Sequence, residues 1–459
     1  MPLDLVPEAA DQKAARLSSK PIDALDADAT HYRIAANYID VLTSKSGIKP
    51  AFCFGSLWRY VPSTKLWVES SLDAIAAAVG AEYQGLKLCR RGSDYRQIAN
   101  LVSFICADDS FFSDAPAGIA AGSDFWTVTA EGDVVSESLS ADHRQRLKIS
   151  SPPVFDAEAN LFGMLLDNAF GIGEAGMAQR ELLQMAMGAA CIRVLWRHRT
   201  VLMLYGKTST GKSTLLEIVK SLFPADVVGA TSPQNWGSEY YVAALAGKML
   251  NLVGEIDPHT PIPGGAFKAV TGGDVVEGRH PTHRPFSFVC DAGHIFNANR
   301  LPPTRDKDDA FYRRWRIVEF KNPIPVGQEN TRLAERIIAE EHGAVLGWLL
   351  DGAARLAKRG GLPETDEHVR LVQYWRASNN SALQFLLDAE YCETIAGHEI
   401  KASEVFESYR KWASETGVKP LGRNGFYEAA EDGAGRFGMR LFVDAATKTK
   451  LFSGVSLKK

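Results

Sequence analysis

The sequence predicts an α/β fold in which a mainly parallel β-sheet carries a phosphate-binding loop. Two observations lead to this prediction. Between residues 199 and 298, short apolar and β-branched runs alternate with helical patterns, which is typical of parallel sheets built from strand–helix–strand units. Within this segment, residues 206–213 match the pattern G-x-x-x-x-G-K-[ST] without a mismatch. Strand-forming residues precede the match and helix-forming residues follow it, as such a loop requires.

Length and composition indicate a soluble protein of several domains. The chain has 459 residues, which is too many for one compact core. Its formal net charge is −4, so a nucleic-acid surface, if present, is expected to be local. The amino terminus lacks the pattern of a secretory signal, no apolar run is long enough to span a membrane, and no two cysteines are spaced as C-x-x-C. We therefore expect reduced thiols, a cytoplasmic location and no membrane partner.

Residues 1–150 predict a mixed α+β region rich in helix. Aromatic residues alternate around Pro62 and Ser63, which indicates two strands joined by a turn within 51–68. A second hairpin is expected within 118–140, with its turn at residues 131–133. The helices expected in this region cover residues 34–42, 72–79 and 94–104.

Pro152 and Pro153 mark a joint, after which a helical segment is expected over residues 151–198. Its two amphipathic helices are predicted at 157–170 and 180–195. The sheet follows in residues 199–325, and its elements are a strand at 200–205, a helix at 212–223, a strand at 248–254 and a strand that ends at 297.

A helical lid is predicted after the sheet, over residues 326–380, with one long helix at 329–357. A polar joint at 377–381 leads to a last domain, 381–459. The order of its elements predicts a winged helix, with helices at 402–416 and 423–431 and strands at 439–443 and 450–452.

The residue types of the loop each have a physical role in binding phosphate. The two glycines let the backbone turn tightly and approach a phosphate, and the N–H groups that begin the next helix point at the anion. Lys212 is expected to reach the β- and γ-phosphates of ATP, and Ser213 is expected to offer its hydroxyl to Mg²⁺. The residues predicted to bind the nucleotide are Gly206, Lys207, Thr208, Ser209, Thr210, Gly211, Lys212, Ser213 and Thr214.

Two acidic residues follow the second strand of the predicted sheet. Glu255 emerges where this apolar strand ends, and Asp257 comes two residues later. A carboxylate at this edge can order the shell of Mg²⁺ and activate the attacking water. We predict that Glu255 does both and that Asp257 acts through the metal's waters, with the alternative that Asp257 caps the following loop.

Cationic residues gather at the tip of a predicted hairpin in residues 274–289. Arg279, His280, His283 and Arg284 lie at this tip, where they suit the phosphate backbone of single-stranded DNA. A solvated hairpin tip without a partner is the alternative interpretation.

Two further groups complete the predicted site. Asn299 follows the third strand, where its amide can orient a water and sense the γ-phosphate, and Asn297 is the competing candidate. Arg313 and Arg314 precede a further strand and are predicted to act on the ATP of a neighbouring subunit. The alternative is that they pair with Asp308 or Asp309 on the surface.

The order of five segments resembles that of superfamily 3 helicases, specifically the D5-like and P4-type branch of phage and plasmid replication proteins. The segments are GKTSTGKST, LNLVGEID, FKAVTGGD, HIFNANRLP and AFYRRWRIVEF. The resemblance extends from about residue 50 to the carboxyl terminus. It implies an AAA+-like ATPase core in which Glu255 is the Walker B acid, Lys268 lies in the DNA-binding B′ segment, and Asn299 is sensor 1. Arg314 matches the arginine finger best, with Arg313 beside it.

The resemblance also implies a mode of action. Such proteins form ATP-driven rings, usually hexamers, that move 3′→5′ on single-stranded DNA and unwind forked duplexes in the bacterial host of a phage, prophage or plasmid. Two features of this sequence depart from the pattern. There is no room ahead of the core for the primase domain of many relatives, so a separate primase or initiator is an expected partner. The acidic pair is split by Ile256 into Glu255 and Asp257.

Three other functions share parts of this pattern. A P-loop ATPase that remodels protein or DNA without unwinding needs the nucleotide site but no cationic hairpin. A sequence-specific initiator uses its winged helix to read an origin, and ATP then controls only assembly. A small-molecule kinase is the remote third, because the sequence has no recognisable pocket for a phosphate acceptor.

Overall fold

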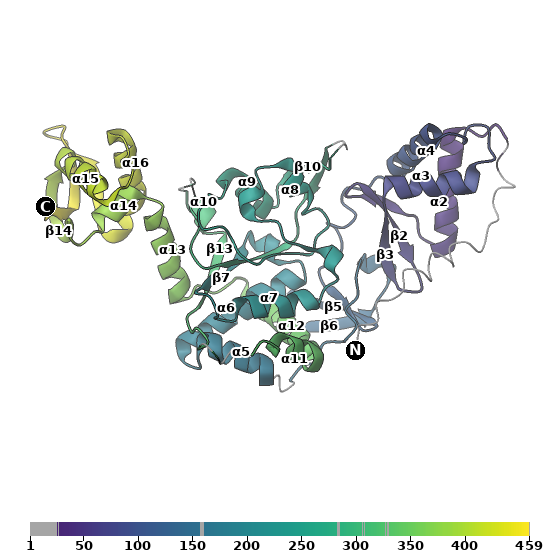
Figure 1. Ribbon diagram of the computed structural model, residues 1–459, viewed down its shortest axis with the longest axis horizontal. Helices are drawn as coiled ribbons and strands as arrows, with labels where there is room; N and C mark the ends of the chain where they lie inside the picture. The colour runs from purple at the N-terminus through teal and green to yellow at the C-terminus, as the bar shows by residue number, and fades with distance from the viewer. Residues whose placement is uncertain are drawn as a thin grey trace. The chain divides into compact units, whose positions relative to one another are not determined.

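The computed structural model describes residue 25 and residues 27–156, 160–281, 285–304, 306, 308–325, 327 and 330–458. The chain divides into two compact units (Figure 1). The first unit comprises residues up to 126 together with 136–150 and 286–288. The second comprises residues 127–135, 151–285 and 289–459.

Three helices and a small antiparallel sheet form most of the first unit. Apolar side chains from all three helices share one core, to which Ile34, Val79 and Ile98 contribute. The three predicted helices are confirmed, and each is longer than expected. Their bounds are α2 His31–Ser46, α3 Leu72–Tyr83 and α4 Gly92–Ile105, and the sheet consists of β1 Ala51–Cys53, β2 Ser56–Val61 and β3 Leu66–Ser70.

Both predicted hairpins are present, and each has one more strand than expected. The β2–β3 turn lies at residues 62–65, where the sequence placed it. In the second hairpin the N–H of Thr129 donates to the carbonyl of Asp133, 2.9 Å away, which closes the expected turn. The strands of this second sheet are β4 Ile119–Ala121, β5 Asp124–Val128 and β6 Val134–Ser138.

A five-stranded sheet is the centre of the second unit, with the strand order β13-β7-β12-β9-β8. All four pairings are parallel, so the carboxyl ends of the strands meet at one edge. The predicted parallel α/β sheet is therefore confirmed. Its strands are β7 Val201–Gly206, β8 Val228–Gly229, β9 Leu250–Val253, β12 Gly293–Ala298 and β13 Trp315–Phe320.

The sheet is buried because its apolar strands pack against helices and a cluster of aromatic rings. Phe267 stacks on Trp315 with ring centroids 4.8 Å apart, and Trp375 meets Trp315 edge-on at 5.1 Å. Such pairs add to the stabilisation that burial of apolar area provides. The helices of this part are α5 Asn160–Phe170, α6 Glu174–Cys191, α7 Lys212–Ser221, α8 Glu239–Ala243, α9 Gly264–Gly272, α10 Asp309–Tyr312, α11 Leu333–Glu340, α12 His342–Arg359 and α13 Asp366–Ser378.

The free edge of β13 is covered by side chains instead of another strand. The N–H of Ile317 donates to Nδ1 of His368 at 3.2 Å, and the N–H of Glu319 donates to Oε1 of Gln179 at 2.8 Å. These bonds satisfy backbone donors that an edge strand otherwise leaves open to unwanted pairing.

Two helix predictions in this unit need correction. The helix predicted at 180–195 begins earlier and ends earlier, at Glu174–Cys191. The helix predicted at 329–357 is two helices, α11 and α12, because Glu341 interrupts it. The carboxylate of Glu341 accepts the N–H groups of Leu161 and Phe162, both at 2.8 Å, and so caps the start of α5. Residues 157–159, where α5 was expected to begin, lie outside the described residues.

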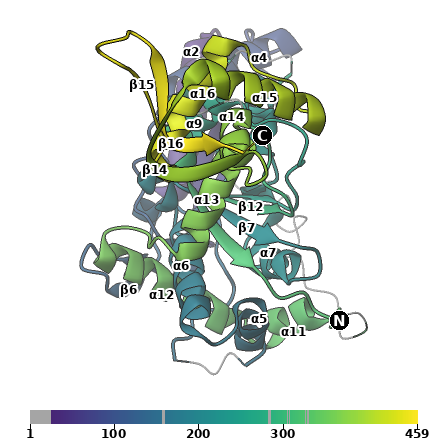
Figure 2. The same cartoon turned by 90° about the vertical axis from the view of Figure 1, so that its left-hand side faces the viewer.

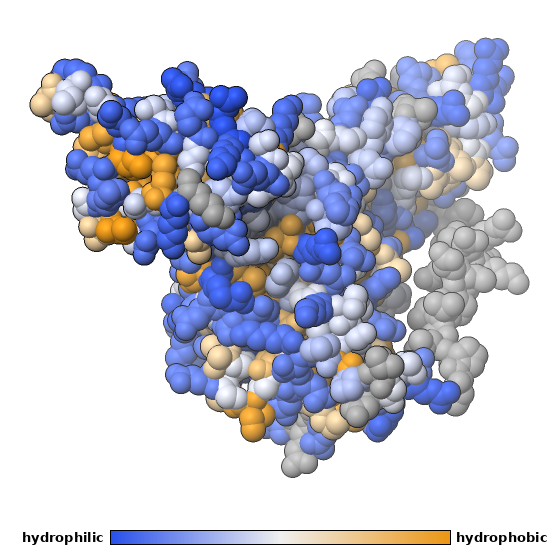
Figure 3. All heavy atoms as spheres, turned by 60° about the vertical axis from the view of Figure 1, so that its left-hand side comes forward, coloured by the Kyte–Doolittle hydropathy of each residue, from blue (hydrophilic) through white to orange (hydrophobic). Residues whose placement is uncertain are grey.

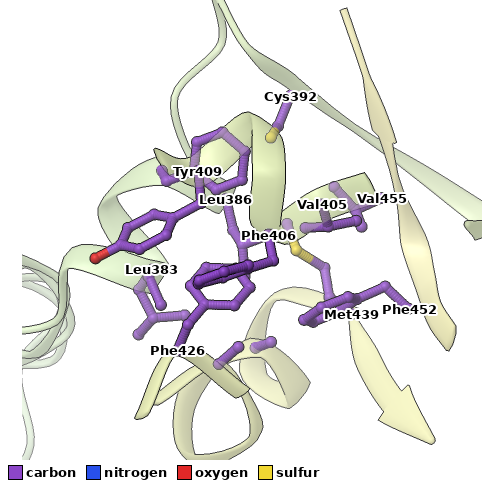
Figure 4. Packing of buried hydrophobic residues seen from close by; sticks show 14 of the residues in the cluster. Leu383, Leu386, Cys392, Val405, Phe406, Tyr409, Phe426, Met439, Phe452 and Val455 are labelled. Carbon is purple, nitrogen blue, oxygen red and sulfur yellow. The ribbon is translucent and has the colours of Figure 1, made fainter. Parts of the chain in front are cut away.

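The last part of the chain has a core of its own. Phe385, Tyr409, Phe426 and Phe452 pack together there, and the ring centroids of Tyr409 and Phe426 are 4.5 Å apart. Figure 4 shows Tyr409, Phe426 and Phe452 within this core. An antiparallel sheet of order β14-β16-β15 lies beside the helices (Figure 2). The predicted helices and strands are present, and the first strand was not predicted. The bounds are α14 Ser381–Leu386, β14 Cys392–Lys401, α15 Ala402–Thr416, α16 Arg423–Ala434, β15 Arg440–Val443 and β16 Lys450–Leu457. The winged-helix assignment stays a prediction.

Hydrophilic side chains predominate on the face drawn in Figure 3. None of the helices in the described ranges is both long and apolar enough to cross a membrane.

Candidate functional site

Three neighbouring strands end at one pocket. β7 leads into the loop 206–213, β9 leads into Gly254 and Glu255, and β12 leads into Asn299. Because these strands are parallel and adjacent, their carboxyl ends bring together residues far apart in the sequence. The pocket has a volume of about 280 Å³. It is lined by Thr208, Ser209, Thr210, Gly211, Lys212, Ser213, Thr214, Gly254, Glu255, Asn297, Ala298 and Asn299.

The loop has the backbone geometry that its sequence predicts. Gly206 has φ +152°, and a Cβ atom there would lie 2.3 Å from the carbonyl oxygen of Phe320 on β13. Gly211 has φ +91° and immediately precedes α7. A side chain at either position would therefore strain the turn. The loop is further fixed by Ser209, whose carbonyl accepts the N–H of Ile324 at 2.7 Å.

Lys212 is folded onto its own loop. Its Nζ donates to the carbonyl of Gly206 at 2.8 Å and also to the carbonyl of Lys207 and the hydroxyl of Thr210. The side chain is only 5% exposed. Burial lowers the pKa of Lys212, and the nearby carboxylate of Glu255 opposes this shift. The ammonium group is thus held where a bound anion can reach it.

Glu255 and Asn299 form a hydrogen-bonded pair across the pocket. Nδ2 of Asn299 donates to Oε1 of Glu255 at 3.0 Å. Glu255 is exposed and Asn299 is half-buried, so the carboxylate can contact a molecule in the pocket while the amide holds it. Both predicted residues therefore line the same pocket as the loop.

Asn297 differs from Asn299 in its surroundings. Its side chain is 2% exposed, and neither its Oδ1 nor its Nδ2 has a hydrogen-bond partner among the described residues. The competing candidate therefore lines the pocket together with Asn299.

Asp257 does not line the pocket. Its carboxylate accepts the N–H of His259 at 2.9 Å and the hydroxyl of Thr260. These two hydrogen bonds, that of Thr260 first, lower the pKa of Asp257. The structure therefore favours the alternative that Asp257 caps a loop, and the metal role predicted for it finds no support in this geometry.

Arg313 and Arg314 lie in different environments. Arg313 is exposed, whereas Arg314 is only 8% exposed, and Nη1 of Arg314 donates to the carbonyl of Ala310 at 2.6 Å. Burial, and then the charge of Arg313, lowers the pKa of Arg314. Of the two predicted fingers, Arg313 is the one that this chain offers to solvent.

Lys268 is held by two carboxylates. Its Nζ lies 2.8 Å from Oδ2 of Asp306 and 2.5 Å from Oδ2 of Asp308. Hydrogen bonds to these two groups raise the pKa of Lys268. Its charge is already balanced within the chain, so these ion pairs compete with any phosphate that approaches the residue.

The cationic hairpin is described in part. β10 Val275–Gly278 and β11 Phe286–Val289 form a two-stranded sheet, as the sequence predicts. Arg279 lies just after β10, 3.6 Å from the carboxylate of Glu239 on α8, in an exposed ion pair. His280 is exposed, while His283 and Arg284 lie outside the described residues.

Sequence reasoning missed two contributors to the site. Gly254 lines the pocket beside Glu255. The sequence offers a signal for it, because it directly precedes the acidic residue. Gln234 fixes the turn after Glu255, because its Nε2 donates to the carbonyl of Asp257 at 2.6 Å. No local pattern marks Gln234, since its partner is 23 residues away.

Comparison with known proteins places a family match on this segment. Residues 204–314 match the model of a family of unknown function, DUF5906. The matched range begins in β7 and ends at Arg314, so it contains the whole pocket. No curated protein matches the sequence.

The chain is similar to solved structures of the C-terminal region of NrS-1. An A-form apo structure of that region has 12% sequence identity and a TM-score of 0.47, and the match covers 91% of this chain and 98% of that chain. Another apo structure of the region has 13% identity and a TM-score of 0.44, with the same coverage.

Proposed function

We propose that the chain is an ATP hydrolase that works on DNA as a helicase of the superfamily 3 type. The observation that carries the proposal is the convergence of three strand ends on one pocket, which brings the loop, Glu255 and Asn299 together. β12 lies between β7 and β9, so Glu255 starts two strand spacings, roughly 10 Å, from the loop. That separation leaves room for a γ-phosphate and an attacking water.

The residues of the pocket suit the steps of phosphoryl transfer to water. The loop N–H groups and the ammonium of Lys212 bind the phosphates, once Lys212 exchanges the carbonyls of its own loop for phosphate oxygens. Glu255 accepts a proton from the attacking water, and Asn299 keeps that carboxylate in position.

The residues present also fit a magnesium ion. Bound Mg²⁺ would neutralise charge on the phosphates, and Ser213 and Glu255 are the groups that would hold it. Both are exposed and line the pocket. In the part of the chain that the structure describes, no three His, Cys, Asp or Glu side chains are grouped to hold a metal. Mg²⁺ commonly takes one or two protein ligands and completes its shell with phosphate and water, so the site needs no such group.

The DNA-directed part of the proposal rests on two features outside the pocket. A hairpin with Arg279 and His280 lies in the chain between Glu255 and Asn299, and cationic groups of this kind bind phosphate backbones. Arg313 follows β12 in the chain and is exposed. A residue that acts on the ATP of a neighbouring subunit in a head-to-tail ring must be exposed in this way. We propose such a ring, with 3′→5′ movement on single-stranded DNA.

The test compares ATP turnover and strand separation. Phosphate release is expected to depend on Mg²⁺, to rise when single-stranded DNA is added, and to disappear in Lys212→Ala. A forked duplex with a free 3′ tail should be unwound only by the wild-type chain with ATP. Turnover that rises with DNA but never separates a fork would make the protein a DNA-stimulated ATPase, and absence of turnover under all conditions would refute the proposal.

A further inference from the structure

Asn297 is a buried amide without a partner in a pocket wall. Both of its polar side-chain atoms are buried, and neither is hydrogen-bonded among the described residues. Leaving such a group unsatisfied costs free energy, and proteins rarely retain one unless water or a ligand completes it. Its backbone carbonyl, by contrast, is hydrogen-bonded: it accepts the N–H of Ile256 at 2.9 Å.

The residue beside Asn297 on the neighbouring strand is a glycine, which leaves open space there. Phe296 pairs with Val253, so one step further along both strands Asn297 lies beside Gly254. A Cβ atom built on Gly254 would meet no atom within 4 Å, so the pocket is open at this point. Where the chain leaves β9, the pocket thus has one carboxylate, that of Glu255, because Gly254 has no side chain and Asp257 caps a turn outside.

We propose that Asn297 is a positioning residue for the magnesium-bound nucleotide, and this inference rests on the proposed ATPase function. Its amide oxygen would accept a hydrogen bond from a water of the Mg²⁺ shell. The amide would then gain in the complex the partner that it lacks without nucleotide. Mg²⁺ keeps several waters in protein sites, so a neutral acceptor beside it is a suitable contact.

The two asparagines then have different tasks. Asn299 already uses its Nδ2 on Glu255 and so acts through the catalytic carboxylate. Asn297 lies two residues earlier, within β12, and has its amide available for the bound ligand. An interior water bound to Asn297 is the competing explanation, and it predicts no effect of nucleotide on this residue.

The test replaces Asn297 by leucine, which has similar size and no polar atom. Without nucleotide, Asn297→Leu is expected to melt about 2–4 °C higher than wild type, because an unsatisfied amide has been removed. Its affinity for a fluorescent ADP analogue with Mg²⁺ should fall about tenfold, while its affinity for the analogue in EDTA should change less than twofold. Asn297→Ala should show the same loss of Mg²⁺-dependent affinity, which guards against an effect of side-chain shape.

Asn251 provides a matched control. It is also a buried asparagine of the sheet, but its Oδ1 accepts the N–H of Thr231 at 2.8 Å and its Nδ2 donates to the carbonyl of Thr231 at 2.9 Å. Asn251→Leu should therefore melt lower than wild type and keep nucleotide affinity.

The outcomes separate this inference from the proposed function. If wild type itself does not bind nucleotide, the ATPase proposal fails. If wild type binds with Mg²⁺ dependence and Asn297→Leu binds equally well, only the role of Asn297 is refuted. A lower melting temperature in Asn297→Leu with unchanged binding would assign the amide to an interior water.

Discussion

Replacing the carboxylate of Glu255 by an amide should separate nucleotide binding from hydrolysis. In Glu255→Gln, the side-chain carbonyl oxygen can still accept a hydrogen bond from Nδ2 of Asn299, which lies 3.0 Å from Oε1 of Glu255 in the wild-type chain. The shape of the pocket is therefore kept, and a negative charge that faces the phosphates is removed. Affinity for ATP is expected to equal or exceed that of wild type.

Turnover of the same variant should fall steeply. A positioned general base commonly contributes 10²–10⁴-fold to a rate, so we expect a loss of about 10³-fold in phosphate release. The assay pairs equilibrium binding of a fluorescent ATP analogue with a steady-state phosphate assay, both with Mg²⁺ and single-stranded DNA. Undiminished turnover at equal affinity would show that Glu255 is not the base.

Asp257→Asn is the control, because it makes the same chemical change two residues away. The amide oxygen of asparagine can still accept the N–H of His259, so the turn loses at most part of its cap, worth about 1 kcal/mol. Turnover should stay within about threefold of wild type. Equal losses in both variants would contradict the separation of the two carboxylates that the structure shows.

Three further predictions concern the arginines, the hairpin and pH. Arg314→Ala should lower the melting temperature, because it removes a buried hydrogen bond to Ala310, whereas Arg313→Ala should melt normally and lose about 10³-fold of DNA-stimulated turnover. Titrating Arg313→Ala with Lys212→Ala chains should restore some activity, and no recovery in rings shown to be mixed would exclude action between subunits. Arg279→Ala should reduce the slope of log affinity for single-stranded DNA against log salt by about 0.7, so an unchanged slope would leave Arg279 a solvated residue. Burial lowers the pKa of His368 from 6.5 to about 4, so between these pH values the unfolded chain binds a proton at His368 and the folded chain does not. The free energy of unfolding should therefore fall by about 3 kcal/mol as the pH is lowered from 6.5 to 4. Urea unfolding at each pH will measure this loss, which should be smaller in His368→Asn.

The fold of the second unit was predictable because its strands carry strong local signals. β7, β9 and β12 are short, apolar and followed by glycine, acid or amide, and parallel pairing then brings their ends together. The interruption between α11 and α12 was not predictable in the same way. Glu341 breaks the helical pattern to cap α5, whose first residues lie 180 positions earlier, and no window of the sequence contains both partners.

The same distinction separates the site residues that were predicted well from those that were not. The spacing of the motif identifies the residues of the loop, because a tight turn followed by a helix determines where the backbone N–H groups point. The role of a side chain that follows a strand depends instead on where the side chain points. Glu255 faces the pocket, whereas the carboxylate of Asp257 accepts the hydroxyl of Thr260 and its backbone carbonyl accepts Nε2 of Gln234. Arg313 and Arg314 differ in the same manner, because adjacent residues on a short helical turn point to different surroundings. A motif therefore specifies which few residues can act, and packing by distant partners decides which of them faces the ligand. Asn297 extends this argument, because it differs from Asn251, another buried polar residue of the sheet, in that its side chain has no hydrogen-bond partner among the described residues.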